Sequence, residues 1–137
     1  MEDIIEQLRE LSEQVPVPLD LPEEDDVLEV EETLLLPIHP SLRTYLLEAS
    51  DTVFGTLEPV TVADPHSHTY LADVTAQAWD EGMPREYMVV CEIAEGFYCI
   101  NHEDGEIQFW SRHTGDFDHQ QQWDSLWDWI EDVWLRS

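Results

Sequence analysis

The chain has 137 residues and carries 32 acidic side chains against five basic ones, for a formal net charge of -27. Nucleic acid and anionic membrane surfaces are disfavoured as direct ligands, because both are bound largely through Lys and Arg side chains. A hydrophobic fraction of 42% with six Trp residues excludes the class of chains that stay disordered, so we expect one folded domain over residues 1–137.

The first part of the chain predicts helices. Apolar residues at helical spacing indicate a short amphipathic helix over 3–15, which a proline ends. Residues 16–26 hold three prolines and a run of acids, which is typical of a solvated connection. Residues 27–36 fit a helix or a strand, and we favour the helix. Pro40 suits the first position of a further helix that runs to about Ser50.

The middle of the chain predicts an antiparallel meander. Residues 57–62 have the β-branched content of a strand, and residues 70–81 return to a helical pattern that glycine and proline then end. The clearest β region follows as three strands, at 87–93, 97–101 and 106–110. The strands are joined by two turns with glycine second, Glu95-Gly96 and Asp104-Gly105. Glycine at this position is the main short-range signal of a hairpin.

The C-terminal stretch predicts a helix whose apolar stripe covers one face of the sheet. The stripe consists of Trp123, Leu126, Trp127, Ile130, Val133 and Trp134. Trp129 lies at the margin of this stripe, where we expect it to stay partly exposed. It then either contacts a partner or packs at the edge of the core. Together the elements predict an α+β fold, in which helices pack around a central antiparallel sheet.

Two features predict a cytoplasmic protein. Residues 1–5 have neither the positive start nor the apolar run of a signal peptide, and no window approaches the ~20 apolar residues of a membrane span. Cys91 and Cys99 fall in neighbouring strands of one predicted hairpin, which permits a disulfide without demanding one.

No motif predicts catalysis. Asp64, His66 and His68 are zinc-ligand types on one side of an extended segment, yet a structural site needs a fourth ligand, so we favour an exposed loop. The acids around Gly105 lack the spaced oxygen ligands of a calcium loop. Nucleophile elbows, phosphate-binding glycine loops and paired zinc-binding histidines are missing. We therefore expect no enzyme, no metal site and no cofactor.

Three stretches resemble the SUKH superfamily, which includes Smi/Knr-like proteins. Leu36-Pro37 followed by residues 42–47 is similar to the Leu-Pro dipeptide and the Tyr-containing apolar helix that open that fold. Residues 88–101 resemble its paired strands with a glycine-containing turn, and residues 105–110 resemble its third strand, which commonly ends in an aromatic residue. The likeness spans residues 27–134. Residues 1–26 then form an N-terminal helix and acidic connection, and residues 27–137 form a SUKH-like core.

The resemblance implies a protein-binding domain without catalytic residues. Members of the superfamily include bacterial immunity proteins that bind and neutralise toxins, often nucleases, and fungal regulators of cell-wall synthesis that act through protein contacts. The chain is therefore expected to be an immunity protein that neutralises a basic toxin, or else a regulatory or scaffold module with no toxin partner.

The acidity suits a basic partner, because opposite net fields speed encounter and help to select the partner. The alternatives are that the charge serves solubility alone or reflects a halophilic source. The candidate contacts are acids at the tip of the second hairpin, acids in the loop after the third strand, and one tryptophan: Glu103, Asp104, Glu106, Asp116, Asp118 and Trp129.

Overall fold

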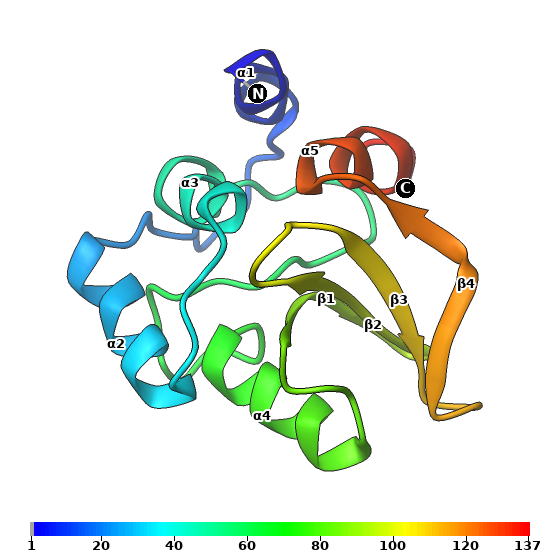
Figure 1. Cartoon of the computed structure of the whole chain (residues 1–137). Coiled ribbons are helices and arrows are strands. Elements are labelled where there is room, and N and C mark those ends of the chain that lie inside the picture. The colour runs from blue at the N-terminus through cyan, green and yellow to red at the C-terminus, as the bar shows by residue number, and fades with distance from the viewer. Residues whose placement is uncertain (1) are drawn as a thin grey trace.

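A computed structural model describes residues 2–137 of the chain (Figure 1). The helices of this part are α1 (Glu2–Leu11), α2 (Glu24–Leu34), α3 (Pro40–Ala49), α4 (Leu71–Glu81), α5 (Leu126–Trp129) and a π-helical turn, η1 (Ile130–Trp134). The strands are β1 (Tyr87–Ile93), β2 (Gly96–Asn101), β3 (Ile107–Ser111) and β4 (Asp116–Trp123). They form one antiparallel sheet in the order β1-β2-β3-β4, which confirms the predicted α+β meander.

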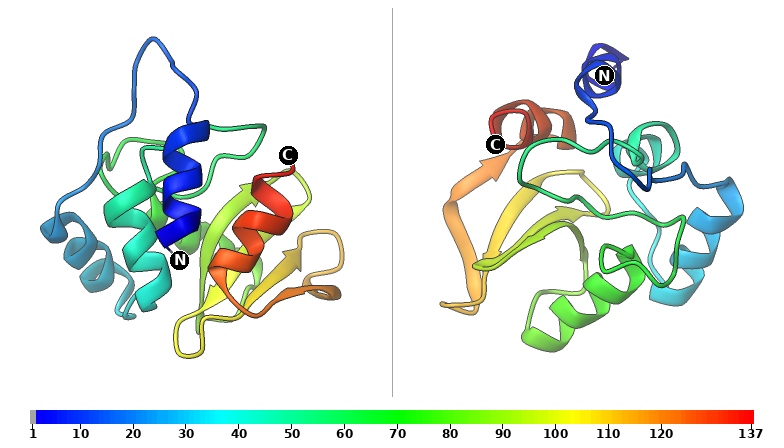
Figure 2. Two further views of the ribbon diagram at one scale, coloured as in Figure 1. Left: turned by 90° about the horizontal axis from the view of Figure 1, so that it is seen from above. Right: turned by 180° about the vertical axis from the view of Figure 1, so that it is seen from behind.

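The sheet lies between two helical layers (Figure 1). On one face lies α4, whose Thr75 hydroxyl oxygen accepts a hydrogen bond from the backbone N–H of Val89 at 3.0 Å. On the other face lies α5, where the ring of Trp129 is 5.3 Å from that of Tyr98. α1 and α3 pack side by side in the same upper layer (Figure 2). Between these layers lies a continuous hydrophobic core, which includes Leu8 of α1.

Three predicted helices are confirmed. The segment that fitted a helix or a strand is helix α2, and its first turn is fixed by a hydrogen bond from the backbone N–H of Glu23 to the Asp26 carboxylate at 2.8 Å. Pro40 begins α3, as its missing N–H and fixed φ favour. Gly82 ends α4 with a φ of 116°, a left-handed conformation that favours glycine. Within the described residues, no helix is long and apolar enough to cross a membrane.

Two predicted boundaries are wrong because tertiary hydrogen bonds replace the local pattern. α1 ends at Leu11 and not at residue 15, since the backbone N–H of Glu13 bonds to the carbonyl of Val53 at 2.6 Å. Residues 57–62 form isolated bridges and not a strand. Val60 N–H bonds to β1, but Thr61 N–H turns to the carbonyl of Thr69, so no continuous ladder forms.

β4 is an edge strand that was not predicted from the sequence. Asp116 and Asp118 were expected in a loop, but both belong to this strand and pair with β3. The pairing shifts between Gln108 and Phe109, so residues 119–121 bulge outward. The Asp118 carboxylate holds the bulge by accepting hydrogen bonds from the backbone of Gln120 and the side chain of Gln121.

The C-terminal helix differs from its predicted phase. Trp123 ends β4, and the helix begins only after Ser125, whose hydroxyl accepts a hydrogen bond from the backbone N–H of Asp128. In η1 the backbone hydrogen bonds join residues five apart, as from Leu135 N–H to the Ile130 carbonyl. This spacing places Trp129 and Trp134 on the same side of the C-terminal helix. Trp129 is 0% exposed, so the expectation that it stays partly exposed is wrong.

Candidate functional site

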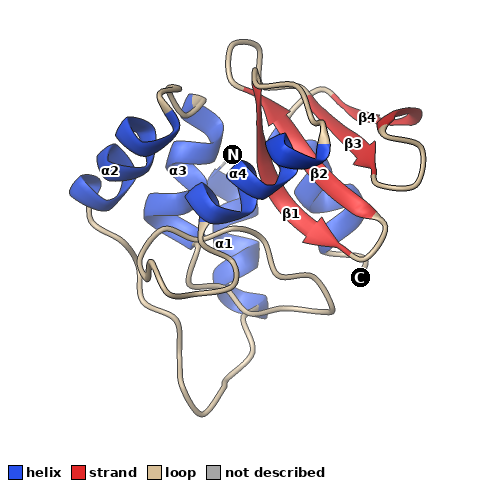
Figure 3. Cartoon of the chain, turned by 90° about the horizontal axis from the view of Figure 1, so that it is seen from below, coloured by secondary structure: helices blue, strands red, loops and turns tan. Residues whose placement is uncertain are grey.

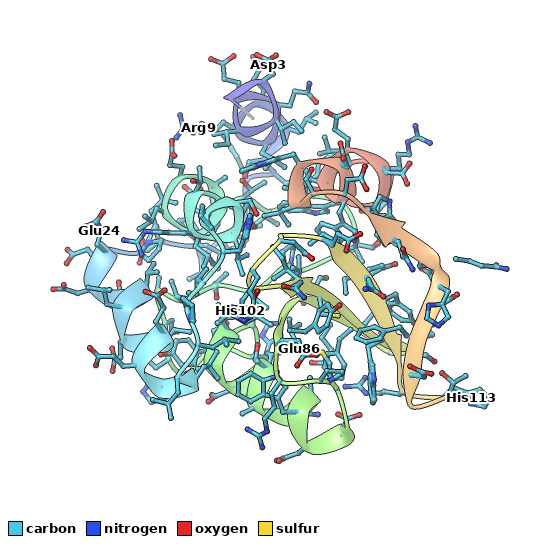
Figure 4. All side chains as sticks on the ribbon, viewed as in Figure 1. Asp3, Arg9, Glu24, Glu86, His102 and His113 are labelled. Atoms are coloured by element: carbon cyan, nitrogen blue, oxygen red, sulfur yellow. The ribbon has the colours of Figure 1, made fainter. Side chains whose placement is uncertain are left out.

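The exterior of the molecule is acidic on every side. Among residues 3–137 no Asp or Glu is buried, and the buried polar side chains are Ser50, Thr52, Thr61 and Thr75. Carboxylates project outward from every layer in Figure 4. The apolar residues are concentrated in the core, and the carboxylates are left as the main exposed chemistry.

All five arginines are engaged within the chain, so they leave most carboxylates without a cation. Their partners are Glu24 and Glu31 for Arg43, Asp132 for Arg136, Glu81 and Glu92 for Arg112, the Glu48 carbonyl for Arg9, and the Trp79 ring for Arg85. Because the exposed pairs are screened by water, they contribute little to stability. The surface therefore keeps an anionic field that nothing in the described chain balances.

Arg112 forms the densest ion-pair cluster of the described residues. Its guanidinium donates to the carboxylates of Glu81 and Glu92 and to the carbonyl of Ile93, and it lies 4.5 Å from the centre of the Phe97 ring. Partial burial alone would lower the pKa of Arg112, but the hydrogen bonds to Glu81 and Glu92 outweigh it and raise the pKa. The cluster ties α4, β1 and the β3–β4 turn together, so its acids serve the fold.

Three of the predicted contact residues lie together at one hairpin tip. Glu103, Asp104 and Glu106 are exposed in the β2–β3 turn, which we call the acidic tip. The Asn101 side chain accepts a hydrogen bond from the backbone N–H of Glu103 at 2.8 Å, and Asp104 accepts one from Glu106 at 2.8 Å. The turn has a fixed shape because its side chains hold its own backbone.

The acidic tip rests against the N-terminus of α3. Gly105 is buried with a φ of 78°, and an added Cβ would lie 2.5 Å from the His39 ring. The His39 ring in turn accepts a hydrogen bond from the backbone N–H of Ser41 at 3.2 Å. Burial lowers the pKa of His39, and the nearby Asp104 raises it by a smaller amount.

The other predicted contacts lie elsewhere. Ser111 pairs with Asp116 at the far end of β3, so Asp116 and Asp118 are separated from the acidic tip by the length of that strand. In Figure 4 His102 and His113 mark the two turns, which lie well apart. Hydrogen bonds from Gln121 and Gln120 lower the pKa of Asp118, which stays ionised within its bulge. Trp129 is buried, so its side chain does not form part of the surface that a partner would contact.

The histidines near residue 66 lie on a loop. His66 donates its backbone N–H to the Asp64 carboxylate at 2.9 Å, and the His68 ring lies 3.0 Å from the Glu58 carboxylate. Over residues 2–137, no group of three or more His, Cys, Asp and Glu side chains could hold a metal ion. The exposed loop is the better description of this segment.

The two cysteines are buried free thiols in the core of the sheet. Cys91 pairs with Tyr98 and Cys99 pairs with Val89, so the two cysteines do not face each other across the hairpin. Burial raises the pKa of Cys91 to about 12 and raises the pKa of Cys99 as well. A thiol that stays protonated at neutral pH is a weak nucleophile.

This environment predicts slow alkylation of the folded protein. At pH 8, below the raised pKa values of both thiols, we expect iodoacetamide to modify Cys91 and Cys99 at least about 100-fold more slowly than in urea-unfolded protein. Mass spectrometry of timed samples measures both rates. Rapid modification of either thiol in the folded protein would contradict the burial described above.

A groove that was not predicted from the sequence lies beside the proline-rich connection. Residues 15–22, which we call the strap, face the loop over residues 61–67 across a cavity of about 490 Å³. Figure 3 shows that the two long connections, between α1 and α2 and between α3 and α4, gather on one side of the molecule. The sequence did hold a signal for this groove, because apolar residues alternate with prolines in the segment VPVPLDLP. The neighbouring acids made the segment look like a solvated connection.

Comparisons with known proteins identify the family. Curated proteins gave no match. A crystal structure described as that of a protein from Pseudomonas syringae pv. tomato is 50% identical to this chain, covers 100% of both chains and has a TM-score of 0.92. The family model of SUKH_5, described as SMI1-KNR4 cell-wall, matches residues 1–135. The chain therefore belongs to the SMI1-KNR4 family, within the SUKH superfamily that its sequence resembles.

Proposed function

We propose that this chain is a non-enzymatic protein-binding domain, an immunity-type protein that neutralises a basic toxin by direct binding. The observation that carries the proposal is the unbalanced surface: five arginines are all engaged internally, while no carboxylate of residues 3–137 is buried. Membership of the SMI1-KNR4 family supports a binding role. The buried, unpaired thiols suit a cytoplasmic protein.

The acidic tip is the proposed first contact with the partner. Its three carboxylates, Glu103, Asp104 and Glu106, are exposed on a turn that its own hydrogen bonds hold in place. Because the backbone of this turn is already ordered, less entropy is lost when its carboxylates pair with an Arg of the partner, and such charge-assisted bonds are stronger than neutral ones. The overall negative field draws the basic partner towards the surface before these contacts form.

Neutralising the acidic tip is expected to slow association. In the variant E103Q/D104N/E106Q the side chains keep their shape but lose three charges, so we expect about a 10-fold lower association rate at low salt and a weaker dependence on salt concentration. Stopped-flow mixing with the purified protein encoded next to this gene, at 20 mM and 300 mM NaCl, measures both.

The control removes the same charge elsewhere. E6Q/E10Q/E48Q changes three exposed acids of α1 and α3 and should slow association by less than about 3-fold. Equal losses in both variants would remove the acidic tip as the contact and leave only the general field. Association that is fast, independent of salt and unchanged in both variants would refute the electrostatic proposal altogether.

The alternative is a regulatory or scaffold module of the same fold without a toxin partner. The family description, SMI1-KNR4 cell-wall, favours this role because it names the cell wall and not a toxin. A toxin gene directly beside this gene supports the immunity role, and an isolated gene supports the regulatory one.

A further inference from the structure

The strap leaves apolar side chains exposed beside a groove. Val17, Leu19 and Leu21 are 82%, 45% and 44% exposed, and all three line the cavity of about 490 Å³ between the strap and residues 61–67. They are three of the six large apolar side chains that the described chain leaves exposed, and the other three are Leu11, Leu28 and Leu35. Clustered exposed apolar residues with a polar rim are typical of interaction sites.

The rim of this strap groove is acidic. Asp20, Glu23, Asp26 and Asp64 line it, and no arginine of residues 2–137 forms an ion pair with any of them. Asp26 accepts a hydrogen bond from the Glu23 backbone, but this bond leaves the charges of both side chains in place. An occupant must therefore bring positive charge, since an uncharged or acidic segment would leave these carboxylates unpaired.

The groove also offers more hydrogen-bond acceptors than donors. Residues 14–22 make no backbone–backbone hydrogen bond within the described chain, and because three of the nine are prolines, they offer nine carbonyl oxygens but only six N–H groups. In the facing loop the Thr61 and Ser67 hydroxyls already bond to the Thr69 hydroxyl, at 2.7 and 2.8 Å. The free groups are therefore mostly carbonyl and carboxylate oxygens, which require a partner rich in N–H donors.

We propose that the strap groove binds an extended, arginine-containing segment of a protein partner. The aliphatic part of an arginine side chain and a neighbouring apolar residue of the segment lie on Val17, Leu19 and Leu21, and the guanidinium group reaches the carboxylates of the rim. Arginine unites the three properties that the groove requires: apolar stem, positive charge and several donors in a fixed fork. The inference rests on the proposed protein-binding role, but it requires neither a toxin nor the acidic tip.

Titration with defined peptides tests the site and its chemistry. We would add an N-acetylated, C-amidated hexapeptide of alternating Arg and Leu to the 15N-labelled full chain and follow the amide resonances. We expect shifts confined to residues 17–23 and 61–67, and affinity at least about 5-fold higher than for a peptide of alternating Arg and Ser. A peptide of alternating Glu and Leu should produce no shifts.

Variants separate the groove from the rest of the surface. V17S/L19S/L21S should weaken binding of the Arg-Leu peptide at least about 10-fold while lowering the melting temperature no more than the control below, because the side chains changed in the two variants are similarly exposed. The matched control L11S/L28S/L35S changes three exposed leucines outside the groove and should bind as the wild type does.

The outcomes distinguish this inference from the proposed function. Shifts that map to the acidic tip and persist in V17S/L19S/L21S overturn the groove and leave the partner-binding role standing. Equal affinity for the Arg-Leu and Arg-Ser peptides, or no response to the Arg-Leu peptide, also overturns it. The proposed function is tested separately, by the stopped-flow experiment on the acidic tip. Association with the partner that does not depend on salt concentration there would refute the proposed function and leave the groove untouched.

Discussion

Trp129→Ala is expected to lower the free energy of unfolding by about 3–5 kcal/mol, the usual cost of removing a large buried aromatic side chain. Trp129 is 0% exposed, and the centre of its ring lies 5.3 Å from the centre of the Tyr98 ring. Tyr98 also packs against Phe109 at 5.0 Å and Trp123 at 5.9 Å. The truncation therefore opens a cavity where four aromatic rings join the C-terminal helix to the sheet. Urea unfolding followed by fluorescence or circular dichroism measures the change.

A neighbouring tryptophan supplies the control. Trp127 is on the same helix but only half-buried, so Trp127→Ala should cost about 1–2 kcal/mol. The opposite ranking, or a Trp129→Ala protein of wild-type stability that binds its partner more weakly, would restore Trp129 as a surface contact. The comparison thus tests the structural correction directly, because the sequence pattern placed Trp129 at the margin of the buried stripe.

The parts of the fold that sequence predicted are those with strong local signals. β1, β2 and β3 are apolar runs with a glycine in or directly after each connecting turn, and α4 ends at a glycine whose left-handed φ stops the helix. β4 was missed because its sequence, DFDHQQQW, offers little apolar alternation and its bulge interrupts what pattern there is. The C-terminal stripe was misplaced because a π-helical turn changes the spacing of the buried residues.

The site was harder to predict than the fold. With 32 acids in 137 residues, sequence alone gives no way to tell which of them share a surface. The turn signal correctly grouped Glu103, Asp104 and Glu106, since a hairpin tip is local. Asp116 lies across the sheet from them because the register of β3 and β4 places it there, and register depends on the whole sheet. The strap groove likewise joins segments about 45 residues apart, and its apolar side chains were taken for part of a solvated connection.

Gly96→Ala is expected to destabilise the protein by about 3 kcal/mol, near the upper end of the usual cost of overpacking. Gly96 was predicted as a turn residue, but it opens β2 and pairs with Ser111. An added Cβ would overlap the carbonyl oxygen of Trp110 and approach Cζ of Phe109 to 3.0 Å. Since the first of these atoms is backbone in the next strand, β2 and β3 must separate locally to accept the methyl group. Urea or thermal unfolding measures the loss.

Gly115→Ala is the matched control, because Gly115 lies in the next turn of the same sheet with nothing within 4 Å of an added Cβ. Its φ of 67° makes alanine strained there, at a cost of about 1–2 kcal/mol from the backbone alone. Gly96 has a nearly extended φ of 158°, so a loss for Gly96→Ala that exceeds the loss for Gly115→Ala reports the contact with Trp110 and not a left-handed backbone. Equal losses would show that β2 and β3 adjust to the methyl group, and that close strand contact is not what requires glycine at position 96.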